Sequence, residues 1–220
     1  MGPARLVRRG AVNASSQLCA YGVAYGGLPI DGNCPHPCVR SILRALIFVF
    51  AGWRQRAKPS RRSGKVTGYG LAYIKYELVR THVGVVCEVE ADRGTGEIRA
   101  NRFFVTHDCG QVINPDGARN QIEGNVIQTT SRVMKESVTF DRKMVTSLDW
   151  STYPILTFPD VPEVVIDLID RPENVPWGVG EATAAVVPAA IANAIYNAIG
   201  RRVRSVPFTP DKIKQALQPI

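Results

Sequence analysis

The side chain best placed to do chemistry is the carboxylate of Glu181, which ends the segment Gly178-Val179-Gly180-Glu181. Two glycines in such a segment permit positive φ and let the backbone approach a ligand closely. An alanine-rich apolar stretch follows, so the carboxylate is expected at the start of a helix, where the helix dipole favours negative charge. Taken alone, the segment is more often an ordinary glycine-rich turn than a catalytic loop. The rest of the sequence is needed to distinguish a turn from a catalytic loop.

A β-hairpin is expected upstream of this segment. Apolar residues alternate with outward positions from Val83 to Val89, and the alternation resumes from Ile98 to Phe104. The intervening residues 92–96, Asp-Arg-Gly-Thr-Gly, have the composition of a turn.

A helix is predicted to follow the hairpin, because Asn114 can cap a helix whose first residue is Pro115. Apolar or small residues recur every three or four positions from Ala118 to Val133, which gives the helix one core-facing side. Gly124 inside this helix costs about 1 kcal/mol relative to alanine. It therefore indicates close packing, against either another protein element or a ligand.

The remaining elements point to an α+β fold, in which the hairpin and a small mixed sheet pack with helices. We expect a short strand over 138–140, a turn over 141–143 and an alternating strand over 163–170. Pro188 is predicted to open a helix that runs through Ile199 and ends at Gly200. Thr209-Pro210 then starts a short last helix to Leu217.

The first part of the chain has a different character. Residues 1–80 hold 13 Lys and Arg against two acids, a net charge of +11, whereas residues 81–220 carry a net charge of −3. Residues 1–35 show no sustained period and are expected to be irregular, and residues 36–69 are predicted to form a helix (37–53) followed by a basic linker (55–68). A domain covering residues 70–220 would follow.

Several classes of function are not supported by the sequence. The basic block lacks aromatic interleaving and any nucleic-acid motif, so nucleic-acid binding is not predicted. The longest apolar run, residues 45–51, is far below the ~20 residues of a membrane-spanning helix, and residues 10–25 are too polar for the apolar centre of an export signal. The five cysteines form no disulfide pattern, and Cys34, His36 and Cys38 fall short of a closed zinc site, so no metal ligand is assigned.

Taken in order, five motifs include or flank Glu181. They are His107-Asp108-Cys109-Gly110 with Ile113-Asn114-Pro115, then Gln121-Ile122-Glu123-Gly124, Tyr153-Pro154-Ile155-Leu156, Gly178-Val179-Gly180-Glu181 and Pro207-Phe208-Thr209-Pro210. This order resembles the C-terminal molybdopterin-binding region of large subunits of the xanthine dehydrogenase and aldehyde oxidase family, nearest to the isoquinoline oxidoreductase and nicotinate dehydrogenase type. The resemblance is clear from about residue 70 to the C-terminus.

The resemblance implies a molybdenum hydroxylase that oxidises a heteroaromatic or aldehyde carbon with oxygen from water. Glu181 would be the catalytic base, and Gln121, Gly124, Gly178 and Gly180 would line molybdopterin, in its cytosine dinucleotide form, with molybdenum. The cofactor carries its metal on its own sulfur atoms, so no protein ligand cluster is required. Electrons would leave to [2Fe-2S] clusters on a small partner subunit, and the small-molecule substrate is not specified.

Two features differ from the family pattern. Asn125 and Gln128-Thr129 replace a glycine and a Gln-Gly pair, and the family's large subunits are several times longer than 220 residues. The chain is therefore expected to need the N-terminal half of a large subunit as a partner and to be inactive alone. A non-catalytic remnant or assembly module with a basic N-terminal segment stays open as the alternative. For localisation, the cytoplasm is favoured for the chain as it stands, while the family resemblance also allows the periplasm.

Overall fold

The computed structural model describes residues 64–77 and 80–218. The irregular segment, the helix and the Cys-His-Cys loop expected within residues 1–63 lie outside the described part, and they stay predictions. The domain boundaries proposed from the sequence also stay predictions.

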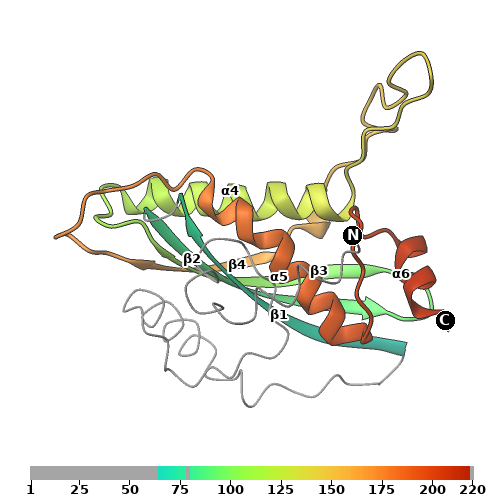
Figure 1. The fold of residues 1–220 in the computed structure, drawn as a ribbon, viewed down its shortest axis with the longest axis horizontal. Helices are drawn as coiled ribbons and strands as arrows, with labels where there is room; N and C mark the ends of the chain where they lie inside the picture. The colour runs from blue at the N-terminus through green and yellow to red at the C-terminus, as the bar shows by residue number, and fades with distance from the viewer. Residues whose placement is uncertain (1–63, 78–79, 219–220) are drawn as a thin grey trace, which may run out of the picture.

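A four-stranded sheet forms the centre of the molecule, in the order β1-β2-β3-β4 (Figure 1). Its strands are β1 (Lys65–Tyr76), β2 (Thr81–Asp92), β3 (Ile98–Asp108) and β4 (Glu163–Ile169). The first three strands are antiparallel, and β4 lies parallel to β3. The predicted hairpin is confirmed as β2 and β3, and the last predicted strand as β4.

Strand β1 was not predicted, and it begins inside the stretch interpreted as linker. Its two glycines and its start in a basic stretch concealed it in the sequence, although the glycines have a structural role. A Cβ at Gly68 would meet the carbonyl oxygen of Ala194 at 2.2 Å, and one at Gly70 would meet that of Ala190 at 2.1 Å. The absence of side chains at these two positions therefore allows a helix to lie directly on the strand.

Three helices complete the described fold: α4 (Pro115–Met134), α5 (Ala182–Ile199) and α6 (Pro210–Leu217). The cap of α4 is as predicted, since the Asn114 side chain accepts a hydrogen bond from the Gly117 amide at 2.9 Å. The predicted start of α5 is wrong, because the helix begins at Ala182 and Pro188 lies inside it. An internal proline costs about 3 kcal/mol, and the burial of flanking residues such as Val187 and Ile191 offsets that cost.

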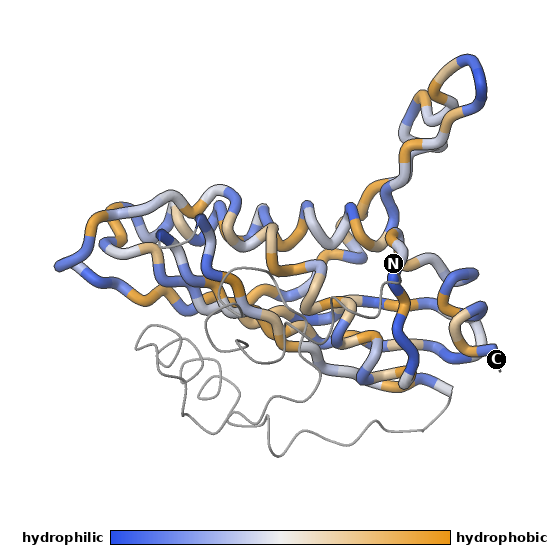
Figure 2. The backbone as a smooth tube through the Cα atoms, viewed as in Figure 1, coloured by the Kyte–Doolittle hydropathy of each residue, from blue (hydrophilic) through white to orange (hydrophobic). Residues whose placement is uncertain are grey.

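The core lies between the sheet and the helices α4 and α5, which cover the same face (Figure 1). It joins β2 and β3 side chains such as Val85 and Phe103 to α5 side chains such as Ile191 and Ile195. Figure 2 shows the apolar character of α5 along its length. By length and composition this helix could cross a membrane, but 61% of it is buried inside the structure, as expected of a core helix.

Residues 137–157 form an arm that projects from the C-terminal end of α4, away from the sheet (Figure 1). The strand expected over 138–140 is not formed, and a single bridge between Phe140 and Val145 closes the tip instead. The predicted turn lies there, because the Asp141 side chain accepts hydrogen bonds from the amides of Lys143 and Met144.

Candidate functional site

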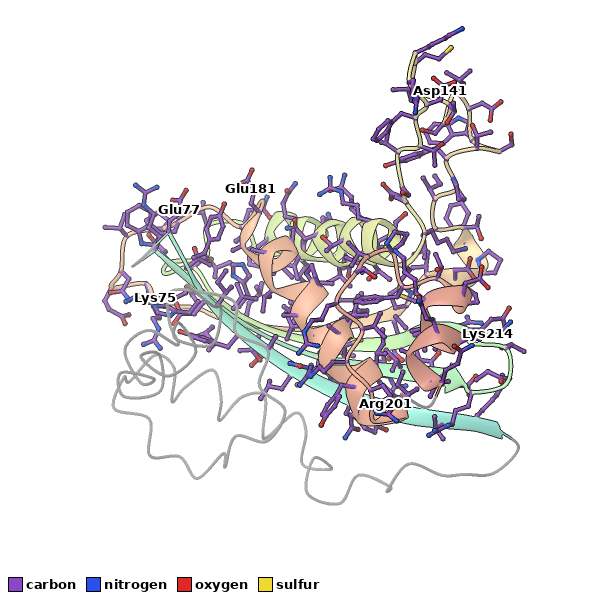
Figure 3. The ribbon with its side chains drawn as sticks, turned by 45° about the vertical axis from the view of Figure 1, so that its right-hand side comes forward. Lys75, Glu77, Asp141, Glu181, Arg201 and Lys214 are labelled. Atoms are coloured by element: carbon purple, nitrogen blue, oxygen red, sulfur yellow. The ribbon has the colours of Figure 1, made fainter. Side chains whose placement is uncertain are left out.

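Glu181 occupies the residue immediately before α5, and its side chain makes no capping hydrogen bond to that helix. The carboxylate is exposed and points outward from the body of the molecule (Figure 3). The hydroxyl of Tyr76, at the end of β1, donates a hydrogen bond of 2.6 Å to its Oε2 atom. A carboxylate that is exposed and held by a single donor keeps oxygen lone pairs available for another proton or ligand.

The loop that precedes Glu181 is fixed by segments distant in the sequence. Each anchor binds a backbone group and leaves the side chain of Glu181 unaffected. The anchors are Trp177 N to Cys109 O at 2.8 Å, Asn125 Nδ2 to Val179 O at 3.2 Å, and Thr81 Oγ1 to Gly178 O at 3.4 Å. Asn125, which departs from the family pattern, therefore helps to hold the loop.

Two of the predicted cofactor-binding residues lie close together, and all four are exposed. Gln121 and Gly180 are brought together, because a Cβ at Gly180 would lie 3.6 Å from the Oε1 atom of Gln121. All four positions, Gln121, Gly124, Gly178 and Gly180, are exposed. At Gly124 and Gly178 an added Cβ would meet no atom within 4 Å. Within the described part of the chain, Gly124 therefore does not pack tightly against another element.

The end of β3 contributes a partly buried ion pair between Asp108 and Arg171. Asp108 is 4% exposed, and it accepts a hydrogen bond of 2.6 Å from Nε of Arg171 and one of 3.2 Å from the amide of Gly110. Gly110 has φ of +80°, and a Cβ there would meet the carbonyl oxygen of Val175 at 2.2 Å. This position thus requires glycine, which lets the chain after β4 lie against the end of β3.

Two contacts involve aromatic residues close to Glu181 in space or in sequence. The pKa of Tyr76 is raised, first because its hydroxyl donates to Glu181 and then because of partial burial. The guanidinium of Arg80 lies over the ring of Trp177, 4.9 Å from its centre, which is a cation–π distance. Sequence reasoning missed Tyr76 because it ends the one strand that was not predicted.

His107 is a buried titratable group in the motif at the end of β3. It is wholly buried, and neither ring nitrogen has a hydrogen-bond partner among the described residues. Burial lowers its pKa to about 4, an effect that the charge of Asp108 opposes. The neutral imidazole is therefore the stable form at neutral pH.

The described residues fit one side of a large flat cofactor. They provide an exposed carboxylate, the amide of Gln121 and glycines whose open faces let a ligand approach the backbone. No group of three or more His, Cys, Asp or Glu side chains in residues 64–77 and 80–218 could hold a metal ion.

Comparison with known proteins identifies the type of domain. Residues 80–162 match the family model of the molybdopterin cofactor-binding domain. The structure of quinoline 2-oxidoreductase from Pseudomonas putida 86 superposes on 62% of this chain and 18% of that chain, with a TM-score of 0.59 and 30% identity. The fold is thus that of the cofactor-binding region of a molybdenum hydroxylase.

Curated relatives give the family. A nicotinate dehydrogenase subunit of Pseudomonas putida is 39% identical over 176 residues, which cover 76% of this chain. The aldehyde oxidoreductase molybdenum-binding subunit PaoC of Escherichia coli is 33% identical over 144 residues, which cover 62%. The chain belongs to the xanthine dehydrogenase and aldehyde oxidase family of molybdopterin-binding large subunits. It spans 15% of the length of the first relative and 20% of the second.

Proposed function

We propose that this chain provides one wall of a molybdenum hydroxylase active site and that Glu181 is its general base. The observation that carries the proposal is the convergence of three segments on the loop that ends in the exposed carboxylate of Glu181, which Tyr76 contacts directly. The end of β1 contributes Tyr76, α4 contributes Asn125 and Gln121, and the end of β3 contributes Cys109.

The cofactor proposed for this wall is molybdopterin with molybdenum, in its cytosine dinucleotide form. Gln121, Gly124, Gly178 and Gly180 would contact it through one side-chain amide and three open backbone positions. When bound, it would supply the two-electron redox chemistry that oxidises a heteroaromatic or aldehyde carbon. Electrons would pass to [2Fe-2S] clusters on a small partner subunit.

The role of Glu181 follows from its geometry. A general base must lie within hydrogen-bond reach of the proton that it accepts, and Glu181 presents an oxygen on the open side. Tyr76 holds the other end of the carboxylate, so the side chain has a preferred orientation before substrate binds. Exclusion of water has to come from protein on the opposite side, because the described residues leave the carboxylate exposed.

The test uses a hybrid protein, in which this chain replaces its matched segment in the nicotinate dehydrogenase subunit, expressed with the electron-accepting partner. We expect Glu181→Gln to lower nicotinate turnover by about 10²–10⁴-fold, the usual contribution of a general base, while molybdenum content stays unchanged. Glu136→Gln is the matched control, because Glu136 also accepts a tyrosine hydrogen bond, from Tyr153 at 2.8 Å. If the Glu181→Gln protein turned over nicotinate as fast as the Glu136→Gln protein, Glu181 would not be the general base.

The alternative is a non-catalytic assembly module. A hybrid protein that assembles with its partner but contains no molybdenum would favour that alternative.

A further inference from the structure

The arm formed by residues 137–157, with Phe158 at its base, concentrates exposed apolar side chains. Of 14 exposed large hydrophobic residues in the described part of the chain, eight lie between residues 138 and 158. Phe158 is 97% exposed, Phe140 76% and Trp150 75%. The others are Val138, Met144, Val145, Leu148 and Ile155. A cluster of this kind marks an interaction site rather than ordinary surface.

Hydrogen bonds within the arm hold its conformation. The Asp149 side chain accepts hydrogen bonds from Ser151 and Thr152, and the Thr146 hydroxyl donates to Thr139 at 2.8 Å. Figure 3 shows Asp141 at the tip, far from Glu181. A preformed element loses little conformational entropy when it binds, so its apolar area is available for affinity.

The base of the arm is fixed to α4. The Leu156 amide donates to the Ser131 hydroxyl at 2.9 Å, and Lys135 pairs with Asp160 at 2.5 Å. The direction in which the arm projects is therefore set by the helix. Its ionised groups, Asp141, Arg142, Lys143 and Asp149, sum to zero charge, which disfavours a nucleic acid or an anionic membrane as the partner.

The comparisons indicate what covers the arm. The match to the family model extends over residues 80–162, a range that includes the arm. The chain spans 15% of the nicotinate dehydrogenase subunit and 18% of the quinoline 2-oxidoreductase chain. Family members thus have several times more polypeptide that can contact the arm.

We propose that the arm docks, through Phe140, Trp150 and their apolar neighbours, into an apolar recess on the remaining part of a molybdopterin-binding large subunit. The contact is made by side chains of the arm and does not involve the loop that carries Glu181. The proposal rests on the family assignment and not on the catalytic role of Glu181.

The first test mixes the purified 220-residue chain with the nicotinate dehydrogenase subunit from which the matched segment has been deleted, and measures the dissociation constant by calorimetry. We expect binding, and we expect Phe140→Ser combined with Trp150→Ser to weaken it at least about 100-fold, since buried aromatic anchors dominate such interfaces. Arg142→Ser combined with Lys143→Ser changes the same arm without changing its apolar side chains, and its affinity should stay within about twofold of wild type.

A second test does not depend on the shortened subunit. Hydroxyl-radical labelling of Trp150 should fall at least about fivefold in the hybrid protein relative to the isolated chain, because the side chain becomes buried. Equal labelling in both would overturn the proposal, whether or not the hybrid turns over nicotinate. Sedimentation of the isolated chain as a dimer that the Phe140 and Trp150 changes dissolve would also overturn it, because a second copy would then be the occupant.

Discussion

Replacing Gly70 by alanine will force β1 and α5 apart. The new Cβ would lie 2.1 Å from the carbonyl oxygen of Ala190 and 2.2 Å from the amide nitrogen of Ala194, whereas ordinary contact begins at 3.4 Å. Both neighbours are backbone atoms of a helix, so no side-chain rotation can relieve the overlap. The strand must withdraw by more than about 1 Å, which opens the core on either side of it.

The cost of this change lies at the upper end of measured overpacking effects, about 3 kcal/mol. That is a large fraction of the roughly 5–15 kcal/mol that stabilises a typical domain. Urea unfolding followed by circular dichroism should show the midpoint lowered by about 1.5 M, for a slope of about 2 kcal/mol per M. The same displacement moves Tyr76, which lies on β1, away from Glu181.

Gly124→Ala is the matched control, because a Cβ at this position in α4 meets no atom within 4 Å. Alanine should there raise the free energy of unfolding by about 1 kcal/mol through helix propensity. The two Gly→Ala changes are thus expected to have opposite signs. A Gly70→Ala protein within about 0.5 kcal/mol of wild type would refute the close packing of β1 on α5.

Two further predictions concern titration. Because Glu181 raises the pKa of Tyr76, Glu181→Gln should lower that pKa, and a tyrosinate absorbance titration that is the same in both proteins would contradict the contact. Burial lowers the pKa of His107 to about 4. As the pH falls below about 6.5, this histidine therefore takes up a proton in the unfolded chain but stays neutral in the folded chain until about pH 4. The free energy of unfolding should therefore fall by about 3 kcal/mol at most as the pH is lowered from about 6.5 to 4. In urea titrations at several pH values, His107→Leu should make the free energy of unfolding less dependent on pH. The same pH dependence in both proteins would refute this role of His107.

The parts of the fold that were predictable have local signals. The alternation from Val83 to Val89 belongs to one strand, and the cap at Asn114 needs only Gly117, three residues away. By contrast, Gly68 and Gly70 in β1 are explained only by α5, more than 100 residues later in the chain. Glycines in a strand normally weaken the prediction of that strand. Here the reason for them is a helix that the local sequence does not reveal.

Some residues of the candidate site were predicted from the sequence, and others were not. Glu181 and Gln121 were predicted from a resemblance, and the structure places Gln121 beside Gly180. Tyr76 was not predicted, because its contact with Glu181 joins residues 105 positions apart and leaves no local pattern. The start of α5 was misplaced because a proline usually opens a helix, whereas burial of the surrounding helix outweighs that preference in this chain.

The length of α4 has a mechanical consequence. The helix joins the proposed cofactor side, at Gln121, to the base of the arm beyond Met134, and these positions are about 20 Å apart along its axis. A rotation of the α4 axis by about 1.5° about its arm end would displace Gln121 by about 0.5 Å. That displacement equals the tolerance within which active-site groups must be held. The buried residues Ile122, Val126 and Val133 restrain such a tilt, so the core packing of α4 and any contact made by the arm would together determine the position of Gln121.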